Sequence, residues 1–255
     1  MIFTDTHVHL YSEDFDKDRK EVIQRALDQG VHRFFIPAID SSHIPAMYNL
    51  ESTFPSQVFL MMGLHPTSVK DNYQEELLRV EEEFEKRDFY AVGEIGIDLY
   101  WDKSLLKQQQ IAFKQQIQLA KRKKLPIVIH CRDAFDEVFD VLESEKGEDL
   151  FGIFHCFTGD LTQAKRALSY NMKLGIGGVV TFKNGGIDKF LNEIPIKEIV
   201  LETDAPYLSP APYRGKRNES SYIKIIAEKV ASIYGLTVAE VAEITTQNSK
   251  DIFGV

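Results

Sequence analysis

The chain opens with Met1-Ile2-Phe3-Thr4-Asp5-Thr6-His7-Val8-His9, an apolar, strand-like stretch that runs into two histidines. Residues at positions i and i+2 of an extended strand project from the same side. His7 and His9 can therefore grip one metal ion together, which two helical histidines at that spacing could not. We accordingly predict a strand that delivers metal ligands at its C-terminal end.

Strand-like and helix-like segments alternate along the whole chain. At this length, eight strands alternating with helices predict an α/β fold of the (β/α)8 TIM-barrel type, in one domain spanning residues 1–255. A doubly wound open sheet is the alternative. The seventh strand has the weakest pattern, because Gly175, Gly177 and Gly178 interrupt it. Strands are expected over 2–8, 32–38, 57–63, 89–95, 126–131, 150–156, 172–177 and 197–202. Helices are expected over 16–29, 73–87, 104–124, 133–145, 160–170, 184–193, 219–234 and 237–248.

Composition narrows the class of protein. Of 255 residues, 44% are hydrophobic and 27% charged, which is typical of an ordinary globular protein, and no apolar run approaches a membrane span. No signal peptide is visible, and Cys131 and Cys156 predict small buried thiols rather than a disulfide, so a cytoplasmic location is expected. The net charge of −9 argues against broad binding to nucleic acid, although a local basic rim can still attract phosphate.

Histidines collect at the expected strand ends, where barrel enzymes place their chemistry. Only His32 and His43 of the seven fall elsewhere, and we interpret these two as structural or surface residues. The five others are His7, His9, His65, His130 and His155.

Carboxylates join these imidazoles. Glu94 lies in an apolar, glycine-flanked context where an unpaired charge would be costly, and Asp204 follows the eighth strand. Four imidazoles and two carboxylates exceed what one catalytic metal needs, and they match two metals bridged by one carboxylate. Mixed nitrogen and oxygen ligation suits Zn, Mn, Fe or Co, and Mg less obviously.

Several segments, taken together and in order, resemble the TatD family of metal-dependent deoxyribonucleases, within the wider amidohydrolase-like barrels. Three positions depart from the family pattern, Val8, Thr158 and Ser220, and none is an expected ligand. The matching segments are DTHVHL (5–10), GLHP (63–66), GEIGID (93–98), HCRDA (130–134), HCFTG (155–159), ETDAPYLSP (202–210) and RGKRNE (214–219).

The resemblance implies a TIM barrel with two divalent metal ions, often assayed as Mg or Mn. It implies that His7, His9 and Asp204 serve one metal, that His130 and His155 serve the other, and that Glu94 bridges them. It also implies hydrolysis of phosphodiester bonds in DNA, commonly as a 3′–5′ exonuclease on single strands. Asp204, beside the attacking water, is placed to act as general base, so Asp204 and Glu94 are the expected catalytic residues.

Basic residues near the expected strand ends are candidates for gripping phosphate. Arg214, Lys216 and Arg217 follow the eighth strand, and Arg132 follows His130. A solvated surface turn is the alternative for the first three. His65 could hydrogen-bond a phosphate or the leaving oxygen, or it could orient the loop before Pro66.

Two other segments invite a nucleic-acid interpretation. The run Lys121-Arg122-Lys123-Lys124 ends an expected helix, where positive charges interact favourably with the helix dipole. The helices of a barrel end at the face opposite the active site, so we expect this run to be structural. Tyr100 and Trp101 could stack on a base, and covering the barrel mouth is an equally good interpretation.

Three functions remain open from the residues. The first is a two-metal phosphodiesterase acting on DNA, with RNA a further possible substrate. The second is ester or amide hydrolysis on the same site, for example deacylation of D-aminoacyl-tRNA. The third is a metal-binding scaffold without catalysis, which the complete ligand set disfavours.

Overall fold

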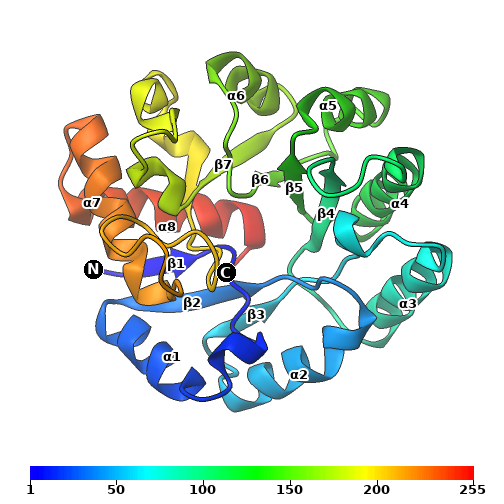
Figure 1. Cartoon of the computed structure of the whole chain (residues 1–255), viewed down its shortest axis with the longest axis horizontal. Helices are drawn as coiled ribbons and strands as arrows, with labels where there is room; N and C mark the ends of the chain where they lie inside the picture. The colour runs from blue at the N-terminus through cyan, green and yellow to red at the C-terminus, as the bar shows by residue number, and fades with distance from the viewer.

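The computed structural model describes all 255 residues, and its eight strands form a parallel β-barrel ringed by helices (Figure 1). The strands are β1 (Phe3–Asp5), β2 (Val31–Ile36), β3 (Val58–Leu60), β4 (Val92–Asp98), β5 (Ile127–Arg132), β6 (Gly152–Phe154), β7 (Met172–Ile176) and β8 (Ile199–Leu201). The helices are α1 (Arg19–Asp28), α2 (Ile44–Thr53), α3 (Tyr73–Lys86), α4 (Leu106–Lys123), α5 (Phe135–Ser144), α6 (Leu161–Leu168), α7 (Ile223–Tyr234) and α8 (Val238–Phe253). The predicted (β/α)8 barrel is confirmed.

The strands pair in sequence order, in the runs β1-β2-β3 and β4-β5-β6-β7-β8. A parallel bridge between Met62 and Val92 joins the two runs. At the other seam, Thr6 N donates to Leu201 O over 3.1 Å, and Asp204 N donates to His7 O over 2.9 Å. These bonds close the sheet on itself and bring the segments after β1 and β8 side by side.

The barrel core is apolar, and one end of it is plugged by α8. Inward-facing residues of the strands, among them Phe35, Val128 and Ile153, pack in one buried cluster with Ile252 and Phe253 of α8. The rings of Phe35 and Phe253 stack with centroids 3.8 Å apart. The predicted helix 237–248 was therefore too short, because two apolar residues beyond Lys250 and Asp251 continue it into the barrel base.

One other predicted helix was wrong, and one helix was not predicted. Residues 184–193 form no α-helix but short 3-10 turns, η5 (Ile187–Lys189) and η6 (Leu191–Glu193). Gly186 precedes the first turn at φ 79°, a conformation outside an α-helix. Conversely, α2 was not predicted, because its only buried residues are Met47 and Leu50, too few to show a helical period.

Most strands are shorter than predicted, and β4 is displaced along the chain. It begins at Val92 rather than 89, so Glu94 lies inside the strand instead of at its end. Its pairing with β5 shifts register between Gly93 and Ile95, which leaves Glu94 as an extra residue. Such a bulge re-aims a side chain, and here it coincides with the carboxylate at the centre of the barrel mouth.

No helix of the protein has the length and hydrophobicity needed to cross a lipid bilayer.

Candidate metal centre

Glu94 lies buried among histidines, and its two carboxylate oxygens face different ones. Oε2 is 3.1 Å from Nε2 of His7 and 3.8 Å from Nε2 of His9. Oε1 is 2.8 Å from Nε2 of His155 and 2.9 Å from Nδ1 of His130. The carboxylate therefore lies between two pairs of imidazoles, one pair contributed by the segment after β1 and the other by β5 and the end of β6.

Asp204 completes this arrangement from the loop after β8. Its Oδ1 lies 3.5 Å from Nε2 of His9 and 3.8 Å from Nε2 of His7. The backbone is in the left-handed region at Asp204, with φ 57°, and at Cys156, next to His155, with φ 42°. Residues other than glycine rarely adopt this conformation. Such conformations cluster at functional sites. The structure thus brings together all six residues expected to bind metal.

The protonation states of the two carboxylates and of His7 suit metal binding. Burial disfavours a charge on Glu94, but His155, His65 and His7 hold its pKa well below the usual range. Burial likewise opposes the charge on Asp204, while the hydrogen bond from His9 and the nearby imidazoles lower its pKa. Burial also lowers the pKa of His7 and favours its neutral ring. Ionised carboxylates and neutral imidazoles are the forms that bind metal ions. Burial opposes a charge on His155, but Glu94 and Glu202 raise its pKa well above the ordinary value, so this ring must lose a proton before it binds a metal.

His7 provides a test of whether the residues fit a metal. Both of its ring nitrogens are buried, Nδ1 has no hydrogen-bond partner, and Nε2 lies 3.1 Å from Oε2 of Glu94 without hydrogen-bond geometry, which is costly for polar atoms. Its Nε2 points at Glu94 and Asp204, where a cation would satisfy it. Groups of donor atoms lying within 4.8 Å of one another occur three times, as His7 with His155 and Asp204, His7 with His9 and Glu94, and His65 with Glu94 and His130. The donor set therefore fits a divalent metal.

His65 approaches the same carboxylate in a different role. Its Nε2 lies 3.3 Å from Oε1 of Glu94, and its Nδ1 accepts the backbone N–H of Thr67 over 3.1 Å. A backbone N–H can only donate, so Nδ1 is an acceptor and the proton of the neutral ring sits on Nε2. Burial lowers the pKa of His65, which keeps the ring neutral. His65 is thus arranged as a hydrogen-bond donor rather than as a metal ligand.

Two carboxylates that sequence reasoning missed support the histidines from behind. Oδ2 of Asp98 pairs with Nε2 of His130 at 2.8 Å. Oε1 of Glu202 accepts the backbone N–H of Cys156 over 2.6 Å and lies 3.5 Å from Nδ1 of His155. Carboxylates in this position fix the orientation of a ligand histidine and raise its basicity. The available signal was their place at strand ends, within the segments GEIGID and ETDAP.

The basic residues expected to bind substrate divide into two kinds. Arg132, Arg214 and Lys216 are exposed and form no ion pair, and the guanidiniums of Arg132 and Arg214 lie over the rings of Tyr100 and Phe182, at 3.6 and 3.5 Å from the centroids. Arg217 instead makes a two-pronged bond to Asp18, over 2.8 and 2.7 Å. Its guanidinium fork is already occupied.

The remaining candidates lie away from the centre. His32 is exposed on β2, and His43 pairs with Asp40 at 2.9 Å. The basic run at the end of α4 is tied to acidic neighbours, with Arg122 paired to Glu81 and Lys123 to Glu85, both at 2.8 Å. This agrees with the expectation that the run is structural.

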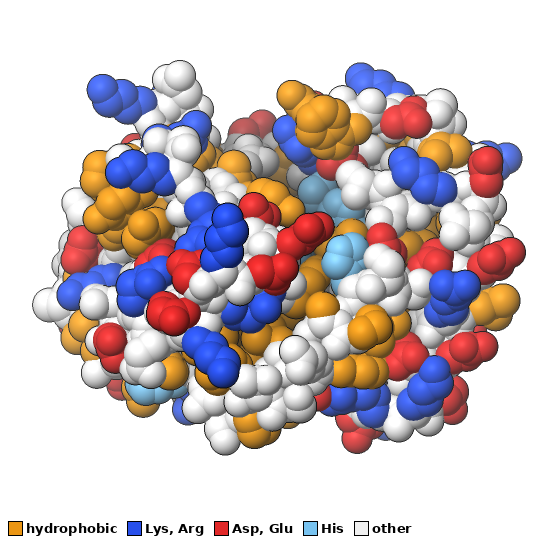
Figure 2. All heavy atoms as spheres, turned by 60° about the horizontal axis from the view of Figure 1, so that its bottom comes forward, with side chains coloured by type: hydrophobic (Ala, Val, Ile, Leu, Met, Phe, Trp, Pro, Cys, Tyr) orange, Lys and Arg blue, Asp and Glu red, His pale blue; other side chains and the backbone are white.

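The protein surface is hollowed over the centre, and Figure 2 shows histidine side chains at the bottom of this hollow. One part of this hollow has a volume of about 780 Å³. It is lined by His9 and Tyr207 and by the acidic residues Glu13, Asp14 and Asp16.

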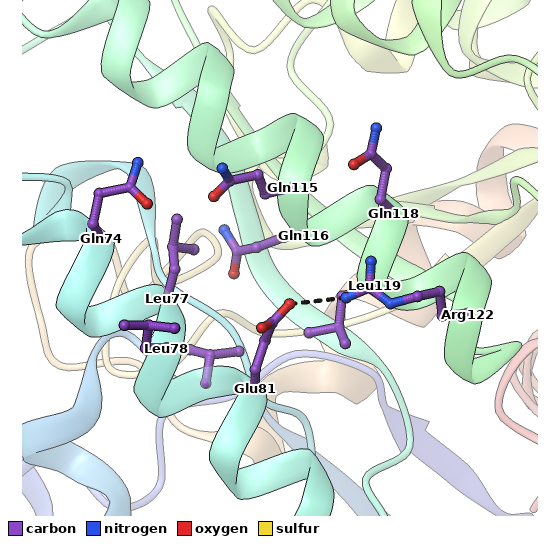
Figure 3. A pocket seen from close by; sticks show the side chains of 10 residues that line it. Gln74, Leu77, Leu78, Glu81, Gln115, Gln116, Gln118, Leu119 and Arg122 are labelled. Carbon is purple, nitrogen blue, oxygen red and sulfur yellow. Dashed lines mark hydrogen bonds and ion pairs between the residues drawn. The ribbon is translucent and has the colours of Figure 1, made fainter.

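A smaller groove of about 270 Å³ lies between α3 and α4 (Figure 3). Glutamines and leucines line it, with one ion pair, Glu81 to Arg122, and it holds no cluster of metal-ligating groups. The three clusters of metal-ligating groups all lie at the barrel mouth.

Comparison with known proteins places these features in a family. The model of the TatD related DNase family matches residues 4–254. An uncharacterized metal-dependent hydrolase of Bacillus subtilis, YabD, is 40% identical over 100% of both chains. A protein of Yersinia pseudotuberculosis named 3′-5′ ssDNA/RNA exonuclease TatD is 30% identical over 98% of each chain.

The fold also matches a solved structure. The crystal structure of YjjV, a TatD homolog from Escherichia coli, superposes with a TM-score of 0.93 at 28% identity, covering 99% of this chain and 98% of the other.

Proposed function

The chain belongs to the TatD-related DNase family, and from this premise we propose that it is a metal-dependent hydrolase of phosphodiester bonds that degrades single-stranded DNA from the 3′ end. The observation that carries the proposal is the division of the Glu94 carboxylate. One oxygen faces His7 and His9, and the other faces His130 and His155. A carboxylate arranged in this way would let His7, His9 and Asp204 hold one divalent cation and His130 and His155 a second, with Glu94 between the two pairs.

Divalent ions held here would polarise a phosphoryl oxygen and acidify a water that attacks phosphorus. The protein contributes the proton transfers and the grip on the substrate. Asp204, kept ionised by the imidazoles around it, accepts the proton of the attacking water at Oδ1. His65, with its proton on Nε2, donates a hydrogen bond to an oxygen of the scissile phosphate.

Arg132, Arg214 and Lys216 bind flanking phosphates, because they are exposed at the segments after β5 and β8 and no carboxylate neutralises them. Such a local basic rim accounts for how a chain with a net charge of −9 attracts nucleic acid. The YabD and TatD relatives carry names consistent with metal use and with single-stranded DNA or RNA substrates, respectively.

The test is a nuclease assay on metal-stripped protein. A 5′-labelled single-stranded DNA is incubated with Mg²⁺, Mn²⁺ or Zn²⁺ in turn, beside a copy whose 3′ end is blocked by phosphorothioate linkages. We expect a ladder that shortens from the free 3′ end, stalls on the blocked copy and is absent with Glu94→Ala. Single-stranded DNA left intact with every metal would overturn the proposal, and RNA and D-aminoacyl-tRNA would then be the next substrates to try.

A further inference from the structure

Two neighbouring aromatic side chains, in the loop after β4, are exposed at the barrel mouth. Trp101, the only tryptophan of the chain, is 74% exposed, and Tyr100 is 52% exposed. Their rings meet edge to face, with centroids 4.8 Å apart and an interplanar angle of 90°. Large apolar side chains that lie together in water mark an interaction surface more often than a structural need.

The guanidinium of Arg132 is part of the same group. Its Cζ lies 3.6 Å from the centroid of the Tyr100 ring and 5.7 Å from that of Trp101. Stacking of this kind holds the planar cation in place without a carboxylate partner, so its N–H groups stay free to bind an anion. We call Tyr100, Trp101 and Arg132 the stacking platform.

Short connections tie the platform to the candidate metal centre. Tyr100 N donates to Oδ1 of Asp98 over 3.0 Å, and Oδ2 of the same carboxylate pairs with His130. Arg132 is the last residue of β5, two positions beyond His130, and its backbone oxygen accepts the N–H of Leu99 over 2.9 Å. In Figure 2 hydrophobic side chains gather on the rim of the hollow beside the histidines.

We propose that the stacking platform binds an unpaired nucleobase of the substrate, next to the phosphate that is cleaved. This inference rests on the proposed function and adds what distinguishes the substrate. An open aromatic face beside a free guanidinium matches the alternation of base and phosphate in a single strand. A base within a duplex keeps both faces stacked on its neighbours, so the platform selects for unpaired ends.

The hollow beside His9 and Tyr207 does not compete for this role. The hollow there is lined by Glu13, Asp14 and Asp16, whose charges repel phosphate. The phosphate next to the bound base is therefore directed toward Arg132, whose guanidinium has no carboxylate partner.

Trp101 makes the proposal directly measurable, because the fluorescence of a sole tryptophan reports stacking at that position alone. The protein is saturated with Mn²⁺ and titrated with phosphorothioate-linked oligo(dT), which resists hydrolysis. The comparison probe is an abasic phosphorothioate oligomer of the same length, which carries the same charges but no bases. We expect oligo(dT) to quench the fluorescence and the abasic oligomer to leave it unchanged.

Affinity of labelled oligo(dT), measured by anisotropy, then tests the side chains. Trp101→Ala should weaken binding about tenfold, whereas Trp101→Phe, which keeps a ring, should restore most of it. Leu78→Ala removes a side chain that is 61% exposed in the distant groove of Figure 3 and serves as the matched control. It should bind like the unmodified protein.

Equal quenching by both probes, or oligo(dT) binding that does not change in Trp101→Ala, would overturn the platform. A parallel hydrolysis assay separates this result from failure of the proposed function. Degradation of DNA at an unchanged rate by Trp101→Ala would remove the platform and leave the nuclease. Base-dependent quenching without hydrolysis of any nucleic acid would support the stacking platform and overturn the proposed nuclease function.

Discussion

Asp98 holds His130 by the ring edge opposite the one that faces Glu94, through a 2.8 Å contact between Oδ2 and Nε2. A ring gripped in this way presents Nδ1 to the centre in one orientation only. Burial opposes a charge on His130, yet the hydrogen bonds to Asp98 and Glu94 raise its pKa. A divalent ion held by His130 would require Nδ1 to be free of its proton, and Asp98 is placed to keep the other proton of the ring on Nε2.

Asp98→Asn should therefore lower metal affinity by roughly 10- to 100-fold, because the neutral amide no longer raises the basicity of His130. Isothermal titration with Mn²⁺ measures this change. Asp102→Asn is the matched control, since it removes the same charge from an exposed residue bonded to Ser104. Equal Mn²⁺ affinity in the two variants would show that Asp98 does not act through His130.

Gly175 makes room for the other supporting carboxylate. A Cβ at this position would lie 2.3 Å from Oε2 of Glu202 and 3.0 Å from Cα of His155. Gly175→Ala should displace Glu202 and His155, cost about 1–3 kcal/mol of unfolding free energy and reduce activity. Urea denaturation and the nuclease assay measure the two effects.

Gly177→Ala provides the comparison two residues along the chain. Its added Cβ would come no closer than 3.6 Å to any neighbour, which is ordinary contact. Its backbone, at φ −110°, is open to alanine, so the variant should be as stable as the parent or slightly more so. If both alanine variants lost the same stability, crowding of Glu202 would not be the cause.

Asp98 and Glu202 show which features of the site the sequence alone does not reveal. His7, His9, His130 and His155 were predictable because polar residues at the ends of apolar strands meet at one face of a barrel. Asp98 and Glu202 lie in equally visible positions, but only the folded structure reveals which carboxylates contact a ring nitrogen and which face solvent. Of the three glycines that weakened the seventh strand in sequence, Gly175 leaves the space that Glu202 needs, whereas Gly178 lies against the backbone oxygen of Leu208.

The displacement of β4 has a similar origin. Val92 to Asp98 reads as the end of a strand followed by a glycine-rich turn, yet the segment continues as strand through a register shift at Glu94. Local sequence carries no information on the partner strand that produces this shift. Likewise, Arg214 and Arg217 cannot be told apart in the segment RGKR, and only contact with Asp18 distinguishes them.

Metal binding should stabilise the fold, because the buried Nε2 of His7 gains a partner. At a metal concentration about 1,000 times the dissociation constant, linkage predicts about 4 kcal/mol, or roughly 8–16 °C in Tm. Thermal unfolding with EDTA, then with added Mg²⁺, Mn²⁺ or Zn²⁺, measures it. The Tm of Glu94→Gln should rise much less when a divalent ion is added. An unchanged Tm with each ion would count against the metal centre itself.

His65→Ala should separate substrate contact from metal binding. If Nε2 of His65 donates to the scissile phosphate, its removal should lower kcat roughly 100-fold. The rise in Tm on adding metal should stay as large as in the parent, because the ring is not a ligand. His32→Ala, an exposed histidine on β2, is the control for kcat. A loss of the metal-induced rise would instead make His65 a ligand.

Alanine substitution should mainly weaken DNA binding at Arg214 and mainly lower the unfolding free energy at Arg217. Arg214 has no ion-pair partner, so Arg214→Ala should weaken DNA binding for all sequences and reduce the slope of log affinity against log salt by about 1. Its stability should change by less than about 0.5 kcal/mol. Arg217→Ala breaks the pair with Asp18 and should cost up to about 1 kcal/mol of unfolding free energy, since both side chains are a third exposed.

The pH dependence checks the origin of that cost. The hydrogen bonds from Arg217 lower the pKa of Asp18 in the folded protein, so the stabilisation is complete above its unfolded value near pH ~4. It is lost as the pH falls through the lower folded value. The stability difference between the parent and Arg217→Ala should therefore persist at neutral pH and vanish in acid. A difference that stayed constant into acid, together with DNA binding as weak as that of Arg214→Ala, would return Arg217 to the substrate-binding rim.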